Sequence, residues 1–418
     1  MTARPRTPRA HLTVCSVGLA CTLAFSGALA ATPEPLRLVP GTATELDCPP
    51  DAPRAARQTP AAGDTAADDA VAAGRAALRI GIWGDSHTAT GAFAEGMAAA
   101  LGLDPVDLAP TFLAASWTIR GIVHPLRVVC ASPAWRPALA WQGARGVGAG
   151  LVAVSSEQHG SQLGFDFRWP QADARVASVR LHVTKQRADR ALVLGLSADG
   201  GAEVLVTLDG AVTEPLRILP TRPAALLTVR LIAGEATVHG LSPVYAQAQR
   251  PRDHLDVFSL PGATAEGWRH VAVTDAAFAA SKPVLDLAVL QYGTNDAPGA
   301  AQRPEEHALS LREGLRRFGL AYPGTRCVLV GPPDRGGGGP GGPHAAAHGQ
   351  VAALQQRAAR EAGCWFWDWQ AAMGGRGSAA AGVTRVPPVM QADLTHLTPQ
   401  AYRAHGHAFG AWLAGPHR

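Results

Sequence analysis

The stretch 80–88, with the sequence IGIWGDSHT, constrains the fold of this chain more than any other. An apolar run ends at Trp83 and Gly84, and a segment with a helical pattern follows over 90–101. Strand, glycine turn and helix in this order are typical of an α/β fold, which exposes side chains at the carboxyl ends of its strands. In such a turn Ser86 has an exposed hydroxyl and a backbone N–H near a helix N-terminus, where developing negative charge is stabilised.

The same alternation of strands and helices returns after residue 253. Predicted strands cover 256–260, 284–292, 325–333 and 364–369, and predicted helices cover 304–322, 344–363 and 397–413. In the helix 304–322 we expect the apolar side to consist of Leu309, Leu311, Leu315 and Phe318. Strands that alternate with helices predict a parallel sheet covered by helices on both faces.

A different pattern fills residues 104–250. Short runs of alternating apolar and polar residues are separated by turns, two of them at Asp199-Gly200 and Asp209-Gly210. This spacing indicates an antiparallel β-sandwich. We therefore expect an all-β module inserted into an α/β domain made of 77–103 and 251–418.

The first 76 residues predict a targeting segment and a connector. Residues 1–30 combine an arginine-bearing start, an apolar run over 12–25 and the small-residue cleavage site Ala-Leu-Ala at 28–30, as in a secretory signal peptide. The alternatives are a retained membrane anchor, for which the run is short, and a lipoprotein signal at Cys21, whose preceding residues fit poorly. Residues 31–76 are rich in Ala, Pro, Thr and Asp, and indicate a leader or linker.

Composition excludes several classes of function. A hydrophobic content of 47% with 17% charged residues is typical of a globular protein with a substantial core. Of the 37 basic residues, Arg4, Arg6 and Arg9 lie in the signal segment, and the remainder nearly balance the 33 acidic residues. Nothing here favours binding to nucleic acid or to an anionic membrane surface.

Removal of the signal leaves four cysteines, an even number that permits disulfides in an exported chain. Cys327 and Cys364 each open a predicted strand, and neighbouring parallel strands would place them side by side. We predict a Cys327–Cys364 bridge on this ground, and a Cys48–Cys130 bridge without a comparable argument from the pattern.

Three α/β turns carry polar residues that acyl transfer needs. Ser86 supplies a hydroxyl, the turn 293–296 (GTND) supplies an amide, and the turn 393–396 (DLTH) supplies an imidazole and a carboxylate. Imidazole can remove the serine proton near neutral pH, and a carboxylate three residues away can hold its tautomer. An amide side chain and backbone N–H groups can stabilise the oxyanion of the tetrahedral intermediate.

These three blocks resemble those of the SGNH/GDSL hydrolase superfamily. The resemblance implies a flavodoxin-like three-layer fold with a parallel sheet, here interrupted by the all-β, jelly-roll-like sandwich. It implies that Ser86 is the nucleophile, His396 the general base and Asp393 its orienting partner. It also implies an oxyanion hole formed by the backbone N–H groups of Ser86 and Gly262 and by the side chain of Asn295. No cofactor and no metal is implied.

A closer likeness is to bacterial peptidoglycan O-acetylesterases, in which a carbohydrate-binding-like β module interrupts the hydrolase domain. It is carried by GDSH, YGTND, GPPD (331–334) and FWDWQAAMGG (366–375). The β module matches only in its position in the chain and in its pattern of short alternating runs. The likeness implies a periplasmic or secreted esterase that removes O-acetyl groups from a cell-envelope polysaccharide such as peptidoglycan. Alternatives are an O-acetyltransferase using the same residues, a non-catalytic carbohydrate-binding protein, and a lipase or thioesterase.

Several other polar or aromatic residues have two readings each. Asp85 and His87 are possible substrate contacts, although His87 equally fits a polar position on the first helical turn. His344 and His348 are spaced to face one metal ion, but two ligands alone are a weak signal. For three aspartates we expect turn, capping or supporting roles: Asp296, Asp334 and Asp368. Tryptophans that either fill a core or stack on sugar are Trp117, Trp135, Trp141, Trp365, Trp367 and Trp369, with Phe366 beside them.

Overall fold

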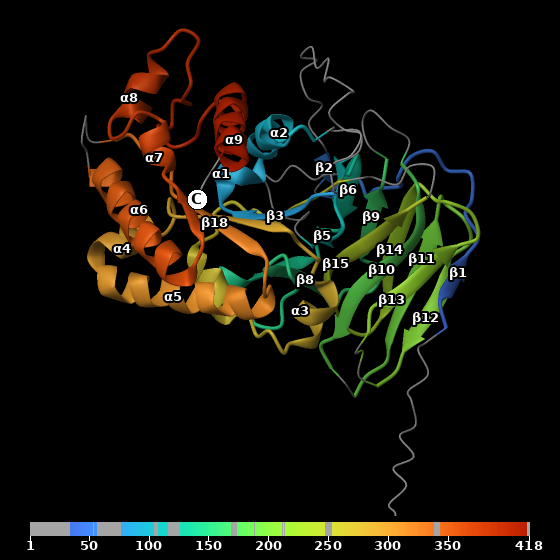
Figure 1. Cartoon of the computed structure of the whole chain (residues 1–418). Helices are drawn as coiled ribbons and strands as arrows, with labels where there is room; N and C mark the ends of the chain where they lie inside the picture. Colours follow the sequence, from blue (N-terminus) through green and yellow to red (C-terminus); the bar gives the residue numbers. More distant parts are fainter. Residues whose placement is uncertain are drawn as a thin grey trace, which may run out of the picture. The chain divides into compact units, whose positions relative to one another are not determined.

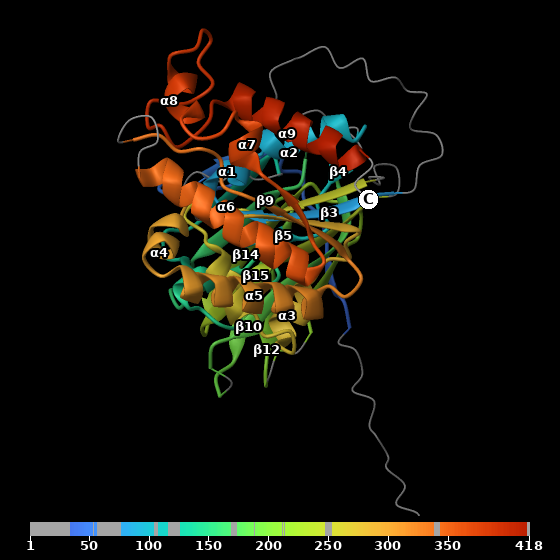
Figure 2. The ribbon, with the colours of Figure 1, turned by 60° about the vertical axis from the view of Figure 1, so that its left-hand side comes forward.

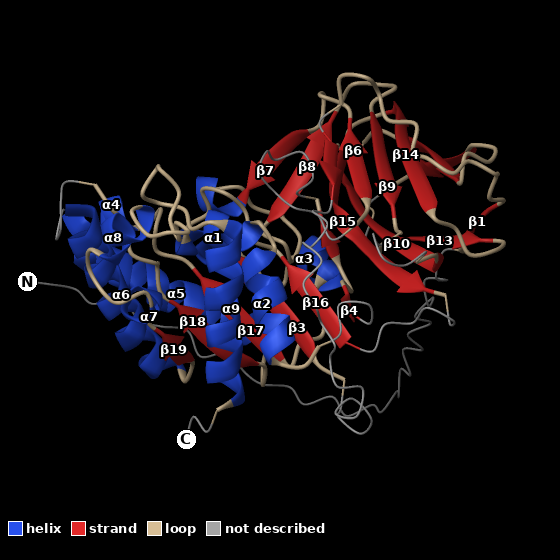
Figure 3. Ribbon diagram, turned by 90° about the horizontal axis from the view of Figure 1, so that it is seen from above, coloured by secondary structure: helices blue, strands red, loops and turns tan. Residues whose placement is uncertain are grey.

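A six-stranded parallel sheet organises the residues on both sides of the insertion. Its order is β19-β18-β17-β3-β16-β4, and every neighbouring pair is parallel (β3 and β18 are labelled in Figure 1, and the whole order can be followed in Figure 3). The strands are β3 (Arg79–Gly84), β4 (Leu108–Ala109), β16 (Asp253–Val257), β17 (Leu287–Gln291), β18 (Arg326–Val330) and β19 (Trp365–Trp367). Because β3 is first in the chain yet lies between β16 and β17, the strand order reverses beside it. Such a switch point leaves a crevice at the carboxyl ends of the strands.

This computed structural model describes residues 34–52, 54–56, 77–103, 108–115, 126–168, 174–187, 189–210, 212, 214–246, 253–337 and 343–415. The predicted signal peptide and Trp117 lie outside these residues. Within them, no helix is long and apolar enough to cross a membrane.

Helices cover both faces of the parallel sheet, which confirms the three-layer α/β prediction. One face is covered by α2 (Ala92–Ala100) and α9 (Pro399–Ala414), and the other by α5 (Pro304–Ala321) and α6 (Pro343–Ala362) (Figure 2). The strand period of two explains the division, since Ile80 and Ile82 join the first layer and Trp83 joins the second. The shorter helices are α1 (Ser86–Ala89), α3 (Ala276–Ser281), α4 (Ala297–Gln302), α7 (Trp369–Ala372) and α8 (Ser378–Val383), with 3-10 turns η1 (Ala140–Gln142) and η3 (Ala265–His270).

Glycine allows α2 and α9 to approach each other closely. A Cβ added at Gly96 would collide with the backbone of Arg403, and one added at Gly406 would collide with the backbone of Phe93. The tight contact fixes where α9 begins, and the turn 393–396 lies directly before it.

The prediction of the apolar side of α5 was wrong for one residue, Leu309. Leu311, Leu315 and Phe318 are buried against the sheet, but Leu309 is 63% exposed. Residues two positions apart on a helix are rotated by about 200° around its axis. Leu309 therefore faces away from the sheet when Leu311 faces it.

The inserted residues form two facing sheets, as expected (Figure 3). One has the order β1-β13-β10-β15-β8-β7 with β5 also paired to β15, and the other has the order β12-β11-β14-β9-β6-β2. All their pairings are antiparallel except β1 with β13. The bounds are β5 (Leu113–Ala114), β6 (Val128–Ala131), β7 (Arg136–Leu139), β8 (Val152–Ser156), β9 (Gln162–Asp166), β10 (Val176–Lys185), β11 (Leu192–Ala198), β12 (Val204–Leu208), β13 (Leu216–Pro220), β14 (Leu226–Ala233) and β15 (Ala236–Tyr245).

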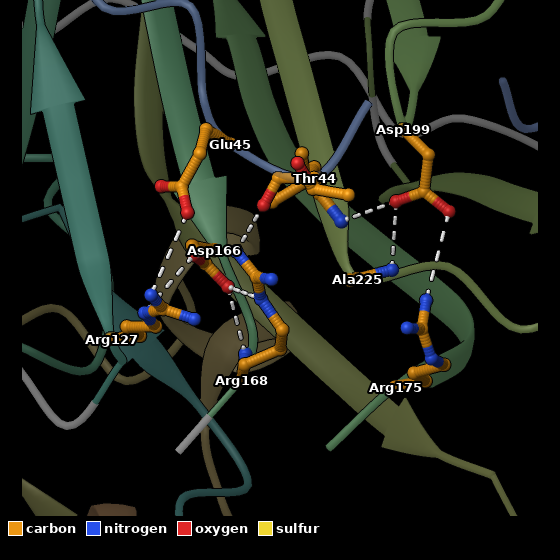
Figure 4. A network of polar contacts seen from close by, with 9 residues as sticks. Thr44, Glu45, Arg127, Asp166, Arg168, Arg175, Asp199 and Ala225 are labelled. Atoms are coloured by element: carbon orange, nitrogen blue, oxygen red, sulfur yellow. Dashed lines mark hydrogen bonds and ion pairs between the residues drawn. The ribbon is translucent and has the colours of Figure 1, made fainter. Parts of the chain in front are cut away.

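The expected linker 31–76 is in part structured. Its residues form β1 (Leu36–Leu38) and β2 (Arg54–Ala56), which are edge strands of the two sandwich sheets. Between them, the Thr44 carbonyl accepts a hydrogen bond of 2.7 Å from the Arg168 guanidinium (Figure 4). Three-residue strands are too short to produce a readable period of two, so the pattern missed them.

The other boundary also shifts. Residues 108–109 form β4 at the edge of the parallel sheet, so the sandwich begins after them and not at residue 104.

Both disulfide pairings are confirmed. Cys327–Cys364 joins the start of β18 to the residue before β19, and Cys48–Cys130 joins the 34–52 segment to β6. The second bridge fixes the segment that carries β1 to the sandwich.

Candidate active site

The nucleophile turn is built from a strand end that only glycine fits. A Cβ added at Gly84, the last residue of β3, would lie 2.8 Å from the Gln291 carbonyl oxygen of the neighbouring strand. Asp85 then caps α1, because its carboxylate accepts a hydrogen bond of 3.0 Å from the His87 N–H. The half-buried Ser86 is the first residue of α1, at the carboxyl end of the central strand.

The structure brings Ser86, His396 and Asp393 into one hydrogen-bonded row. Ser86 Oγ lies 2.9 Å from His396 Nε2, and His396 Nδ1 lies 2.6 Å from Asp393 Oδ2. The other carboxylate oxygen of Asp393 accepts the backbone N–H groups of Thr395 and His396, at 3.0 and 2.9 Å. One aspartate therefore fixes both the backbone of the turn and the imidazole that it carries.

The ionisation state of the Asp393 carboxyl group follows from its surroundings. Partial burial tends to raise the pKa of Asp393, but hydrogen bonds from the His396 ring and from the backbone N–H groups of His396 and Thr395 outweigh it and lower that pKa to about 2. The carboxylate is thus ionised at neutral pH, where it favours the tautomer with the proton on Nδ1 and leaves Nε2 free to accept from the serine.

Gly262 and Asn295 lie on two loops that are pinned together. Gly262 has a φ of 82°, a left-handed conformation that suits glycine, and it is exposed. The Asn295 side chain donates to the Ala263 carbonyl at 3.0 Å, which leaves its second N–H available. The Leu260 N–H donates to the Gly84 carbonyl at 2.9 Å, so the Gly262 loop is also held to the nucleophile turn.

Asp296 also holds the loop that follows Gly262, and together with Asn295 it forms a clamp on the segment 263–265. Its carboxylate is 8% exposed and accepts the Ala265 N–H at 3.1 Å, at the start of η3. Consecutive residues, Asn295 and Asp296, thus hold both ends of the segment 263–265. Burial raises the pKa of Asp296 to about 7, because few groups there compensate for the lost hydration of its charge.

Asp85 and His87, which were named as possible substrate contacts, form hydrogen bonds inside the fold. Both are fully buried. His87 Nδ1 lies 2.8 Å from the Tyr402 hydroxyl, and its ring packs against those of His396 and Trp369, with centroids 5.4 and 5.8 Å away. Burial lowers the pKa of His87, so it supports His396 as a neutral ring, and burial raises the pKa of Asp85 to about 7.

The two remaining aspartates have the expected capping roles. Asp368 caps α7 by accepting the Ala371 N–H, and the buried Asp334 accepts the N–H groups of Gly377 and Ala379 at the start of α8.

The aromatic residues near β19 fill a core. Trp367 and Trp369 are buried and pack against Phe93, while Trp365 packs edge-on against Trp412. In the inserted region, Trp135 is buried in the sandwich core and Trp141 is half-buried. The core interpretation is therefore confirmed for Trp135, Trp367 and Trp369.

The histidine pair on α6 has no third ligand among the described residues, which contain no cluster of three metal-binding side chains. His348 is buried and its Nδ1 lies 2.7 Å from the Pro333 carbonyl oxygen.

Sequence reasoning missed two residues that support the site. Tyr402, in the first turn of α9, lies six residues after His396 and orients His87, and the Gln291 side-chain oxygen accepts a hydrogen bond of 3.3 Å from the Asp85 N–H. A glutamine at the end of an otherwise apolar strand was the available signal for Gln291. Tyr402 gave no signal, because it reads as one more apolar position of α9.

Comparison with known proteins agrees with this geometry. Residues 228–404 match the model of the GDSL-like lipase/acylhydrolase family. The match includes the Asn295 and His396 turns but starts within β14, so it leaves out Ser86, which the inserted strands separate from the other two turns. No curated protein matches the chain significantly.

One solved structure shares the fold, and others match more weakly. A structure titled "Peptidoglycan O-acetylesterase in action, 5 min" superposes with a TM-score of 0.58 at 18% identity, over 81% of this chain and 91% of that one. A lipase/acylhydrolase from Enterococcus faecalis matches with a TM-score of 0.30 at 17% identity, over 39% and 76%. A family two carbohydrate esterase from Cellvibrio japonicus matches with a TM-score of 0.28 at 8% identity, over 68% and 96%. Residues 228–404 are thus similar to the GDSL-like lipase/acylhydrolase family, and the chain shares its fold with a peptidoglycan O-acetylesterase.

Proposed function

We propose that this protein is an exported serine esterase that removes O-acetyl groups from a cell-envelope polysaccharide, namely peptidoglycan. The observation that carries the proposal is the row Ser86–His396–Asp393, which lies at the switch point of a parallel sheet beside the loops of Gly262 and Asn295.

Export is supported by two features. Residues 1–30 have the composition of a signal peptide, and the chain carries two disulfides, which persist in oxidising compartments. The fold likeness to a peptidoglycan O-acetylesterase directs the choice of substrate.

The first half of the reaction forms an acetyl-enzyme. His396 Nε2 takes the proton of Ser86 Oγ while the oxygen attacks the acetyl carbonyl carbon. The resulting oxyanion accepts hydrogen bonds from the backbone N–H groups of Ser86 and Gly262 and from the free N–H of Asn295. As the intermediate collapses, the imidazolium gives its proton to the sugar oxygen, and the bond between that oxygen and the acetyl carbon breaks.

The second half repeats the steps with water. His396 takes a proton from water, which attacks the acetyl-Ser86 carbonyl, and then returns that proton to Ser86 Oγ as acetate leaves. Throughout, Asp393 stabilises the imidazolium without taking its proton.

The first test replaces the nucleophile. Ser86→Ala should abolish acetate release from a small acetyl ester such as p-nitrophenyl acetate, because no other described group stands beside His396 Nε2. The variant should keep the wild-type melting temperature, since His396 is the hydrogen-bond partner of the half-buried hydroxyl among the residues that the structure describes. Retained activity in the folded variant would refute the assignment.

The second test concerns the substrate. Acetate release is measured on O-acetylated peptidoglycan and on O-acetylated xylan, and we expect peptidoglycan to give the higher kcat/KM. Adding a glycan acceptor and following the acetyl group separates an esterase from an acetyltransferase, since transfer in preference to hydrolysis would contradict the esterase proposal.

A further inference from the structure

The loop after β18 is fixed against the catalytic turn. Within the segment 333–336, the Gly336 N–H donates to the Leu394 carbonyl at 2.8 Å, and Leu394 lies between Asp393 and His396. A Cβ added at Gly336 would lie 2.8 Å from the Leu394 Cβ, so only glycine permits this approach. On the other side, Asp334 is fully buried and held by α8 and by Gln370. The residue between these two anchors is Arg335.

Arg335 is half-buried and unpaired. Among the residues that the structure describes, no carboxylate forms an ion pair with it. The carboxylates nearest along the two loops are already used, since Asp334 accepts from Gln370, Gly377 and Ala379, and Asp393 accepts from Thr395 and His396. A guanidinium that has lost part of its hydration and lacks a partner is expected to bind an anion from outside.

The guanidinium is also electrostatically close to the site. Burial is the main cause of the lowered pKa of His87, and repulsion by nearby basic groups, the Arg335 guanidinium among them, adds to it. His87 lies directly against His396. Together with the hydrogen bond from Gly336 to Leu394, this places Arg335 beside the turn that carries His396.

We propose that Arg335 binds a carboxylate of the acetylated glycan, so that the substrate is an acidic polysaccharide with an anionic group close to the scissile ester. A planar guanidinium matches a carboxylate through two parallel hydrogen bonds, which fixes orientation as well as charge. This inference rests on the proposed function and narrows it. The lactyl carboxylate of muramic acid, which is free only where no stem peptide is attached to it, and the carboxylate of a uronic acid both have the required chemistry.

The experiment measures inhibition of p-nitrophenyl acetate hydrolysis by pairs of sugars that differ in one carboxylate. N-acetylmuramic acid is compared with N-acetylglucosamine, and glucuronic acid with glucose. In the wild type, the acidic member of one pair should have an inhibition constant about 10-fold lower than its neutral partner, as for a charge-assisted hydrogen bond. Preference within the first pair assigns the lactyl carboxylate, and preference within the second assigns a uronic acid.

Variants connect this preference to the residue. Arg335→Gln should reduce the ratio of inhibition constants to about one, while Arg335→Lys should retain part of it. Arg357→Gln, which removes one charge from an exposed position of α6, is the matched control and should keep the wild-type ratio. Because the ratio is taken within one variant, a general loss of activity or stability does not affect it.

The outcomes separate the two proposals. Equal inhibition by acidic and neutral sugars in the wild type, or an unchanged ratio in Arg335→Gln, overturns the role of Arg335. An Arg335-dependent preference in an enzyme that releases no acetate from O-acetylated peptidoglycan supports that role and overturns peptidoglycan as the substrate.

Discussion

Asp393 has two tasks that one substitution can separate. Its Oδ1 accepts the backbone N–H groups of Thr395 and His396, and its Oδ2 faces His396 Nδ1. An asparagine oxygen can replace Oδ1, but the amide would then present N–H groups to Nδ1. The imidazole would have to carry its proton on Nε2, where it cannot accept from Ser86.

Asp393→Asn should therefore lower kcat on p-nitrophenyl acetate on the order of 1,000-fold or more, with little change in melting temperature. A variant with more than a tenth of wild-type kcat would contradict the role of the carboxylate. Because hydrogen bonding lowers the pKa of Asp393 to about 2, the wild-type carboxylate stays ionised as pH falls from 8 to 4. Any loss of rate over that range should thus belong to another group.

The positions of Ser86, Asn295, Asp393 and His396 were predictable from sequence, but the buried residues that support them were not. Ser86, Asn295, Asp393 and His396 lie in short blocks at strand ends, which are readable locally. The burial of Asp85 and His87 depends on distant partners, namely Gln291, Tyr402 and Trp369, which reach them only after the sheet and α9 have assembled. The sequence around Asp85 and His87 does not reveal those contacts.

Among the elements, the clamp formed by the turn 293–296 on the segment 263–265 is open to a direct test. Asp296→Ala removes the acceptor of the Ala265 N–H and leaves that buried donor unpaired, which costs about 1–3 kcal/mol. Asp296→Asn keeps an oxygen of the same shape in the same place.

We expect Asp296→Ala to lower kcat about 10- to 100-fold with a small change in KM, because the loop that carries Gly262 loses its fixed position before the transition state. Asp296→Asn should remain within a few-fold of the wild type. Equal losses in both variants would show that the charge, not the hydrogen bond, matters. Melting temperatures of both variants serve as the control for folding.

Most elements followed from periodicity, and the exceptions have physical causes. The long strands and helices were predicted within a few residues, since each buries a face with period 2 or 3.6. Strands β1, β2 and β4 have two or three residues and exist only because longer neighbours pair with them. Helix α8 starts where the distant carboxylate of Asp334 accepts its first N–H groups, a cap that local sequence does not contain.

At the scale of the whole molecule, two buried histidines lie where the sandwich meets α3. His182 of β10 and His239 of β15 line a cavity of about 20 Å³ together with Ala277 of α3. Burial lowers the pKa of His182 to about 3 and that of His239 to about 4, against about 6.5 for an unfolded chain.

The sign of the pH effect follows from proton binding. Between pH 6.5 and 4 the unfolded chain takes up protons that the folded histidines exclude, so their contribution to the free energy of unfolding falls as pH falls. Above pH 6.5 that contribution is complete.

His239→Gln should reduce this acid sensitivity relative to the wild type, by at most about 1.4 kcal/mol per pH unit. Chemical denaturation at pH 7.5 and pH 5 measures it. Comparison with the wild type is needed because the buried Asp85 and Asp296, whose pKa values are raised, act in the opposite direction. The exposed His159→Gln is the control, and an equal effect in both variants would contradict the assignment.

The central position of β3 sets the order in which the chain can fold. Arg79 pairs with His254 on one side and Ile80 pairs with Leu287 on the other, so the middle of the sheet must wait for residues made some 170 to 210 positions later. A growing chain can complete most of the sandwich first, while the segment with Ser86 is still unpaired. His396 arrives only with the final helix. We therefore expect a chain truncated before His396 to release no acetate from p-nitrophenyl acetate, because Ser86 then lacks its hydrogen-bond partner.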